Sequence, residues 1–348
     1  MITGIILFIG ISLLIFVHEL GHFIAAKEAG IKVEEFGFGF PPRIKGWRRG
    51  ETLYSINWLP FGGFVRIYGE SKFKAEEDEK RTGEKINEGR AFYARSKWRR
   101  FVVIAAGIAI NFIVGWLLLS TVYFVGDRQR VEITEIKPGS PAQVFDIKIG
   151  DELIGFSSAD EFVAFTKSHG GEKLNLSLLR DGVKISREPI LRDSAAAGEG
   201  LLGAAVSDFG FKELGLFSAL YKGFIDSVSM VAEIFRSLGG LVLKIFTTAS
   251  LPSDVVGPVG IFSMAGEIGR LGFVYVLQVL AMISLNLAAL NALPIPALDG
   301  GRILFIVIEK LRGKTMNPKR EIWANLICFG LLILLMLVIT GRDIVRLF

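Results

Sequence analysis

Residues 5–26 read IILFIGISLLIFVHELGHFIAA, an apolar stretch that carries two histidines and one glutamate near its end. A helix needs about 20 apolar residues to cross roughly 30 Å of hydrocarbon, so this stretch predicts a membrane span. It has no basic leader and no small-residue cleavage site, which favours a retained span over a cleaved signal peptide. Ionisable groups inside a span are costly and usually serve a function.

Three further apolar runs, 101–125, 273–293 and 322–339, have the length of a span. The hydrophobic content of 51% and the mean hydropathy of +0.47 exceed what a soluble domain of 348 residues needs. The sequence therefore predicts a polytopic α-helical membrane protein with four transmembrane helices. Within the third run, polar side chains require partners inside the protein: Gln278, Ser284, Asn286 and Asn291.

The charged residues indicate the orientation of the spans. Residues 27–100 contain 17 Lys and Arg, and residues 302–320 contain 6 against one acidic residue, so both loops are expected in the cytoplasm. The segment 127–272 then lies outside it. Within that segment, residues 211–246 are apolar, but charged residues recur through them, among them Asp226, Glu233, Arg236 and Lys244, which predicts amphipathic helices on the membrane or on the protein. If residues 211–246 crossed the membrane, the third span would run in the opposite direction, and its C-terminal end would lie outside the cytoplasm.

This topology explains the net charge of +5, because Lys and Arg gather beside the apolar runs. They are not interleaved with the aromatic residues that proteins use to bind nucleic-acid bases. We expect the lipid bilayer as a partner and no nucleic acid. The single cysteine, Cys328, excludes a disulfide within the chain and a site of several thiolates. A bound metal therefore requires His, Asp or Glu ligands.

His18, Glu19 and His22 form an H-E-x-x-H motif on the first predicted helix. A spacing of four residues places both imidazoles on one helix face, about 6 Å apart, where they can share one metal ion. Glu19 is then placed to act as the general base that takes a proton from activated water. The alternative is a pair of structural histidines near the membrane interface.

A catalytic zinc takes three protein ligands and keeps one open position. The candidate third ligand is Asp299, which follows a proline-interrupted stretch in NALPIPALDGG, residues 291–301. Pro294 and Pro296 end a helix and free backbone groups, which predicts a place where a peptide is held. Since the first and third spans run in the same direction, His22 and Asp299 both fall toward the cytoplasmic end. The alternative for Asp299 is a turn or helix-cap residue.

These motifs resemble the site-2 protease family of intramembrane metalloproteases, and in particular its bacterial branch that includes the regulator of sigma-E protease. The H-E-x-x-H motif matches directly, and the N-x-x-P-x-P-x-L-D-G motif matches residues 291–300. The approach to the second span, residues 91–111, is also similar, except that Ile108 replaces the usual proline after Gly107. Residues 257–261 resemble the stretch before the third span.

The resemblance implies an intramembrane zinc endopeptidase with one Zn²⁺ per chain, held by His18, His22 and Asp299, with Glu19 activating water. It implies that Asn291 grips the substrate backbone, and we group Asn286, Pro294 and Pro296 with it as substrate-binding candidates. The alternative for both asparagines is hydrogen bonding between helices. The implied substrates are single-span membrane proteins, such as an anti-sigma factor already trimmed outside the cytoplasm, or remnant signal peptides. The implied location is the bacterial cytoplasmic membrane.

Two further regions flank the predicted site. Residues 36–40 and 51–68 predict short strands, which resemble the membrane-reentrant β structure of the family; a small cytoplasmic hairpin is the alternative. Residues 127–195 resemble one bacterial PDZ domain, with departures from its usual pattern at 146–148 and 155–158. That domain either binds peptide or excludes substrates with bulky outer domains, and exclusion is favoured. His169 is expected on its surface.

The predicted organisation has four parts: spans one and two with the β region (1–126), the PDZ-like domain (127–195), amphipathic helices and a linker (196–271), and spans three and four (272–348). The active site is expected toward the cytoplasm and the PDZ-like domain outside it. Two functions of another class stay open: a zinc-binding membrane receptor or transporter, and a membrane-tethered PDZ scaffold without peptidase activity.

Overall fold

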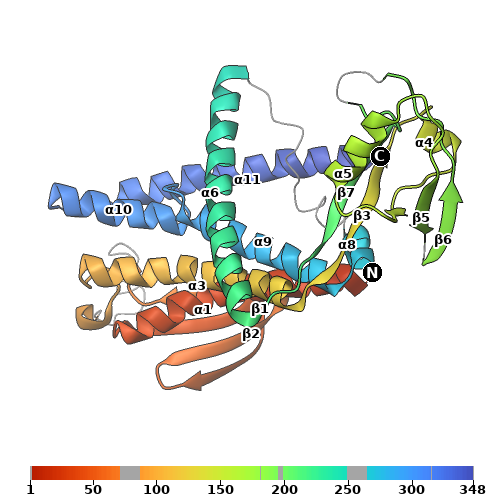
Figure 1. Ribbon diagram of the computed structural model, residues 1–348. Coiled ribbons are helices and arrows are strands. Elements are labelled where there is room, and N and C mark those ends of the chain that lie inside the picture. Colours follow the sequence, from red (N-terminus) through yellow and green to blue (C-terminus); the bar gives the residue numbers. More distant parts are fainter. Residues whose placement is uncertain are drawn as a thin grey trace. The chain divides into compact units, whose positions relative to one another are not determined.

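The computed structural model describes residues 2–70, 87–180, 182–194, 199–248, 265–314 and 316–347. The chain divides into two compact units, residues 1–122 with 217–348, and residues 123–216. Figure 1 shows their helices and strands. The stretch 257–261 that resembles the family lies outside the described residues.

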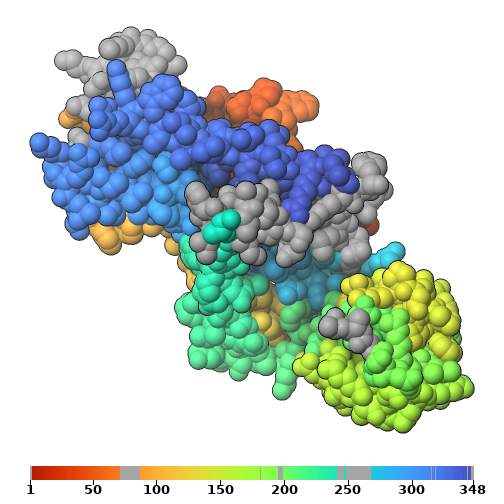
Figure 2. Space-filling view, turned by 90° about the horizontal axis from the view of Figure 1, so that it is seen from above, coloured from red at the N-terminus to blue at the C-terminus, as the bar shows by residue number. Residues whose placement is uncertain are grey.

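Four helices of the first unit are long and apolar enough to cross a membrane: α1 (Ile2–Glu28), α3 (Lys97–Val125), α9 (Phe273–Ala292) and α11 (Pro318–Leu347). They coincide with the four predicted spans, which confirms the prediction of four candidate membrane helices. In α11 the apolar window within Lys319–Arg342 has no buried residues. Figure 2 shows this helix, in deep blue, lying open along the surface, as expected for a helix that faces lipid.

Small residues bring α1 and α3 close together. A Cβ atom at Gly21 of α1 would lie only 2.6 Å from the carbonyl oxygen of Ala106 on α3. Glycine at such a position lets two membrane helices pack backbone to backbone. Helix α3 also contacts α9, because Ser284 of α9 donates a hydrogen bond of 2.8 Å to the carbonyl of Asn111. Helix α3 therefore contacts both helices that flank the predicted site.

Helix α6 (Leu216–Thr248) runs across α3 (Figure 1). The indole of Trp116 donates to the carbonyl of Leu220 at 2.9 Å, and its ring packs against Phe224. The sequence predicts several amphipathic helices here, whereas residues 216–248 form one continuous helix. It is not among the candidate spans. The short elements η1 (Glu88–Arg90), α8 (Ala265–Leu271) and α10 (Asp299–Arg312) complete this unit.

Strands β1 (Val33–Arg49) and β2 (Thr52–Ile67) form a hairpin of two long strands. The prediction of short strands was wrong, because the glycines and prolines that signal strand ends bend these strands instead. Gly39 and Gly62 adopt φ angles of +75° and +73° and lie within the strands. Each strand folds back, so Phe36 pairs with both Val65 and Tyr54, and Tyr54 also pairs with Trp47. Four segments therefore lie side by side in the order 63–67, 33–38, 52–57 and 43–49.

The second unit contains a five-stranded antiparallel sheet in the order β6-β5-β4-β3-β7. Its strands are β3 (Asp127–Ile136), β4 (Glu152–Leu153), β5 (Leu176–Arg180), β6 (Val183–Arg187) and β7 (Ala204–Phe211), and its helices are α4 (Pro141–Val144) and α5 (Ala159–Ser168). The core is formed by buried aliphatic residues such as Val131, Ile133 and Leu178 with Phe162 of α5. Since β7 pairs with β3, this unit extends past residue 195, the predicted end of the inserted domain.

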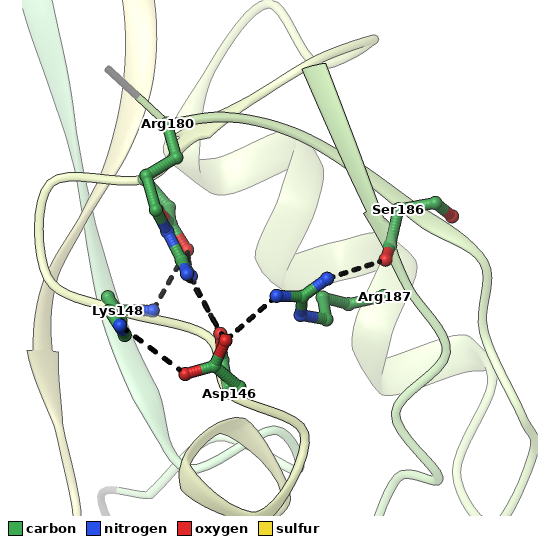
Figure 3. Close-up of polar contacts among 6 residues, drawn as sticks. Asp146, Lys148, Arg180, Ser186 and Arg187 are labelled. Carbon is green, nitrogen blue, oxygen red and sulfur yellow. Dashed lines mark hydrogen bonds and ion pairs between the residues drawn. The ribbon is translucent and has the colours of Figure 1, made fainter. Parts of the chain in front are cut away.

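A charged cluster ties the loop after α4 to β5 and β6 (Figure 3). The Asp146 carboxylate lies 2.8 Å from Arg187, 3.2 Å from Arg180 and 3.6 Å from Lys148. Arg180 also binds the buried carboxylate of Asp151 at 2.7 Å. Asp146 has a φ of +52°, a conformation that aspartate adopts more readily than most residues other than glycine. The Arg187 and Arg180 guanidinium groups lower the pKa of Asp146 to about 2.

Candidate active site

Three potential metal ligands meet at one point, two from α1 and one from the start of α10. The Nε2 atoms of His18 and His22 lie 3.2 Å apart, and Asp299 Oδ2 lies 3.0 Å from the first and 3.1 Å from the second. Both histidines are buried and Asp299 is partly buried. The structure thus brings together residues that are 277 positions apart in the chain.

Backbone carbonyl groups of α3 orient both imidazoles. His18 Nδ1 lies 2.9 Å from the carbonyl oxygen of Gly107, and His22 Nδ1 lies 2.9 Å from that of Val103. A carbonyl accepts only from a protonated nitrogen, so each ring carries its proton on Nδ1 and directs the Nε2 lone pair at the common point. Helix α3 continues without interruption through Ile108, the position where the family usually has proline.

Gly107 provides the space that the histidine rings occupy. A Cβ atom there would overlap the imidazole of His22 and lie 2.9 Å from Cε1 of His18. Asn111, one turn further along α3, is fully buried, and its Nδ2 lies 3.3 Å from His18 Nδ1. No motif marks Asn111 as part of a metal site. Its only sequence indication is that it is the single polar side chain in the apolar run 101–119.

Asp299 is presented by a break between two helices. Helix α9 ends at Ala292, as expected from the two prolines that follow, and α10 begins at Asp299 itself. Within the break, Ala297 adopts a φ of +78°, and its N–H donates to Asn325 Oδ1 of α11 at 2.9 Å. This contact with α11 helps to hold the break in place, and nothing in the local sequence pattern pointed to Asn325.

Glu19 lines a cavity of about 230 Å³ together with His22, Asp299 and Arg302. Its Oε2 accepts a hydrogen bond of 3.1 Å from the backbone N–H of Val65, on the outermost segment of the hairpin. Arg302 forms an ion pair with Glu70, and both side chains line the same cavity. The general-base candidate therefore faces the potential ligands and touches a strand backbone.

The four substrate-binding candidates lie elsewhere. Asn286 lines a separate cavity of about 320 Å³ with Met230 and Glu233 of α6, and its amide donates to the carbonyl of Met282 at 3.0 Å. Asn291 lies in the last turn of α9, Pro294 and Pro296 lie on the stretch that leads from α9 to Asp299, and none of the three is among the residues that line the cavity at Glu19. Their roles stay predictions.

The geometry of the three ligand atoms fits zinc. A tetrahedral ion with bonds of about 2.0–2.1 Å separates its ligands by about 3.3 Å, close to the 3.0–3.2 Å found here. Two imidazole nitrogens and one carboxylate oxygen are a donor set that zinc accepts. Asp299 Oδ2 is buried without a hydrogen-bond donor among the described residues. A cation at this point would satisfy it.

Comparisons with known proteins agree with this chemistry. Residues 6–335 match the model of peptidase family M50. The zinc metalloprotease RasP of Bacillus licheniformis is 30% identical to this chain, over 96% of the chain and 97% of the relative. The regulator of sigma-W protease RasP of Bacillus subtilis is also 30% identical, over 96% of each protein. The chain therefore belongs to peptidase family M50 and is a zinc metalloprotease.

Proposed function

We propose that the protein is an intramembrane endopeptidase in which His18, His22 and Asp299 hold the zinc ion and Glu19 is the general base. The observation that carries this proposal is the convergence of the three ligand atoms on α1 and α10. His22 lies six residues before the end of α1 at Glu28, which is about 9 Å along the helix axis. A peptide bond cleaved at this depth lies inside the membrane or at its edge.

Zinc bound to these ligands supplies a Lewis acid that polarises the scissile carbonyl and activates water. The residues of the chain orient the ligands and transfer the proton. Gly107 and Val103 fix the imidazole rings through their carbonyl oxygens. Glu19, which lines the same cavity as Asp299, takes the proton from the attacking water and returns it to the leaving nitrogen.

The hairpin is the proposed binding platform for the substrate, in a form similar to the membrane-reentrant β structure of the family. Segment 63–67 pairs with another segment on one side only, and its Val65 N–H is directed at Glu19. A substrate stretch that has unwound from its helix can extend this edge by backbone hydrogen bonds. Asn291, in the last turn of α9, and Pro294 and Pro296, in the break that follows, are the candidates for holding the same stretch on its way to Asp299, and Asn286, which lines the separate cavity beside α6, is the candidate for contacting the substrate helix before it unwinds.

The substrate class proposed is single-span membrane proteins whose outer domain has already been removed. The relative named as a regulator of sigma-W protease supports an anti-sigma factor as one such substrate, and a remnant signal peptide is the other. Residues 123–216 are the proposed PDZ-like domain of a one-PDZ branch of the family, and it acts by excluding substrates with large outer domains. In this topology the PDZ-like domain lies outside the cytoplasm of a bacterial cell, and the site lies toward the cytoplasm.

The test uses detergent-purified full-length protein and measures bound zinc and cleavage of a model single-span substrate. Glu19→Gln is expected to keep one zinc per chain and to lose cleavage by a factor of about 10²–10⁴. Asp299→Ala is expected to lose zinc as well as cleavage. His169→Ala, which removes a histidine from the other unit, is the matched control and is expected to leave both unchanged.

A fully active Glu19→Gln protein would refute the assignment of the base. Zinc retained in full by Asp299→Ala would refute the assignment of the third ligand. Zinc bound by the wild type with no cleavage of any trimmed substrate would favour a zinc-binding receptor or transporter over a peptidase.

A further inference from the structure

The hairpin lies along α1 over most of the length of that span. Near its β-turn, the Glu51 carboxylate accepts a hydrogen bond of 2.8 Å from Lys27, close to the end of α1. Toward the opposite end of the hairpin, Ser12 donates a hydrogen bond of 2.7 Å to the carbonyl of Pro60, and the rings of Phe8 and Phe61 are 5.3 Å apart. Ser12 and Lys27 are separated by 15 residues, or about 22 Å of helix. The hairpin therefore extends through much of a hydrocarbon layer that is about 30 Å thick.

The two outermost segments of the hairpin have different surroundings. Segment 63–67 touches α1, because the Val65 N–H binds Glu19. Segment 43–49 is the opposite edge and pairs only with residues 52–57. All of its residues are exposed. Among the residues that the structure describes, none pairs with the other side of this edge.

The exposed side chains change in character with depth along the hairpin. The deep end is apolar, with Phe40, Trp58 and Phe61 exposed by 44%, 67% and 54%. Segment 43–49, which leads from there to the turn at Gly50, combines cations with apolar side chains in the sequence RIKGWRR. Trp47 is 48% exposed and stacks on Tyr54. From the deep end to the turn, the exposed side chains thus change from apolar to basic, as the surroundings in a lipid leaflet change from hydrocarbon to headgroups.

Three cations of this segment, Lys45, Arg48 and Arg49, form no ion pair within the described part of the chain. Two carboxylates of the hairpin and its turn already have partners. Glu35 is buried and pairs with Arg43 and Arg66, and Glu51 pairs with Lys27 and Arg90. The edge therefore carries an uncompensated positive charge beside exposed apolar groups.

We infer that segment 43–49 is a binding site for the phosphate groups of anionic phospholipids in the leaflet that the hairpin enters. Lys45, Arg48 and Arg49 reach along the edge toward the headgroup layer and bind phosphate oxygen, since long basic side chains extend to the interface from apolar surroundings. Trp47 fills the boundary between acyl chain and headgroup, the level that exposed tryptophan prefers. The apolar groups next to the cations favour a lipid over a soluble anion.

The experiment is native mass spectrometry of the zinc-loaded, full-length protein mixed with equal amounts of phosphatidylglycerol and phosphatidylcholine. The wild type is expected to retain phosphatidylglycerol preferentially. The triple variant Lys45→Gln, Arg48→Gln, Arg49→Gln is expected to reduce that preference at least about ten-fold, because each basic residue near a charged surface contributes about five-fold. The matched control is Lys314→Gln, Lys319→Gln, Arg320→Gln, which removes the same charge from exposed cations just before α11 and in its first turn.

The absence of any preference in the wild type, or an equal loss in both triple variants, would overturn the inference. A second measurement does not depend on the triple variant. The fluorescence of Trp47, isolated as the difference between the wild type and Trp47→Phe, is expected to be quenched more by brominated phosphatidylglycerol than by brominated phosphatidylcholine at the same mole fraction. Equal quenching by the two lipids would also overturn the inference. Both readouts are independent of peptide cleavage, so either result leaves the proposed protease function to be judged on its own test.

Discussion

At the scale of single residues, the metal-binding geometry depends on groups that contribute no ligand. Gly107 leaves room for two imidazole rings, and its carbonyl fixes the tautomer of His18. Asn111 fills the space beside the same ring with a fully buried amide. Such supporting contacts commonly change metal affinity by 10–100-fold when they are lost.

Gly107→Ala is expected to lower zinc affinity by about 10–100-fold, because the added methyl group must displace the His22 ring from its position against α3. The measurement is zinc occupancy during titration with a chelator, in parallel with the helix content from circular dichroism. Gly4→Ala is the matched control, since Gly4 lies in α1, another membrane-length helix of the same unit, and a Cβ there meets nothing within 4 Å. Unchanged zinc affinity in Gly107→Ala would show that the rings have more freedom than their contacts indicate.

At the scale of secondary-structure elements, the charged cluster at Asp146 links the loop after α4 to strands β5 and β6 (Figure 3). The pKa of Asp146 in the folded protein is about 2, below the value of 3.8 for a free carboxyl group. A carboxyl group whose pKa falls on folding stabilises the fold above its unfolded pKa. That contribution is lost as the pH falls from about 4 to about 2.

Asp146→Asn is therefore expected to increase the hydrogen exchange of the second unit at pH 5–7, because the ion pairs that resist its opening are lost, and to have little effect near pH 2. The measurement is hydrogen exchange of the β5 and β6 amide groups in the full-length protein across that range. Asp160→Asn, on a carboxylate at the start of α5 in the same unit, is the control. A difference between wild type and Asp146→Asn that persists undiminished at pH 2 would contradict the ion-pair explanation.

The elements differ in how far the sequence predicts them. The four membrane helices follow from length and hydropathy alone, and the H-E-x-x-H spacing places His18 and His22 together on any helix. The two long strands of the hairpin were not predicted, because glycine and proline normally mark the ends of strands. In the hairpin each strand pairs with two segments and continues past these residues. The contacts of Gly107, Asn111 and Val65 depend on how α1 packs against other elements, which no local pattern records. For Asn286, helical position alone could not distinguish the cavity beside α6 from the one beside Glu19.

At the scale of the whole molecule, the loop charges predict that residues 27–100 and 302–320 lie in the cytoplasm and that residues 127–211 lie outside it. This assignment requires that α6 does not cross the membrane, in agreement with its absence from the candidate spans. An additional crossing at α6 would reverse α9 and move Asp299 away from the histidines, which contact it in the structure.

The second unit is accordingly expected to resist an added protease in sealed inside-out vesicles and to be digested after the vesicles are opened with detergent. The measurement is immunoblotting of a tag inserted at Gly182, in the exposed turn between β5 and β6. A tag at Gly50, in the turn between β1 and β2, serves as the control and is expected to be digested in sealed vesicles. Digestion of the Gly182 tag before detergent is added would reverse the proposed orientation.

The separation of the metal ligands along the chain also bears on how the protein is made. Two of the proposed ligands, His18 and His22, lie on α1, and the third, Asp299, begins α10, 277 residues after His22. During synthesis, the two histidines enter the membrane long before Asp299 has been translated. A nascent chain that ends before Asp299 therefore lacks one of the three proposed ligands, and peptidase activity is expected only after α10 has been made.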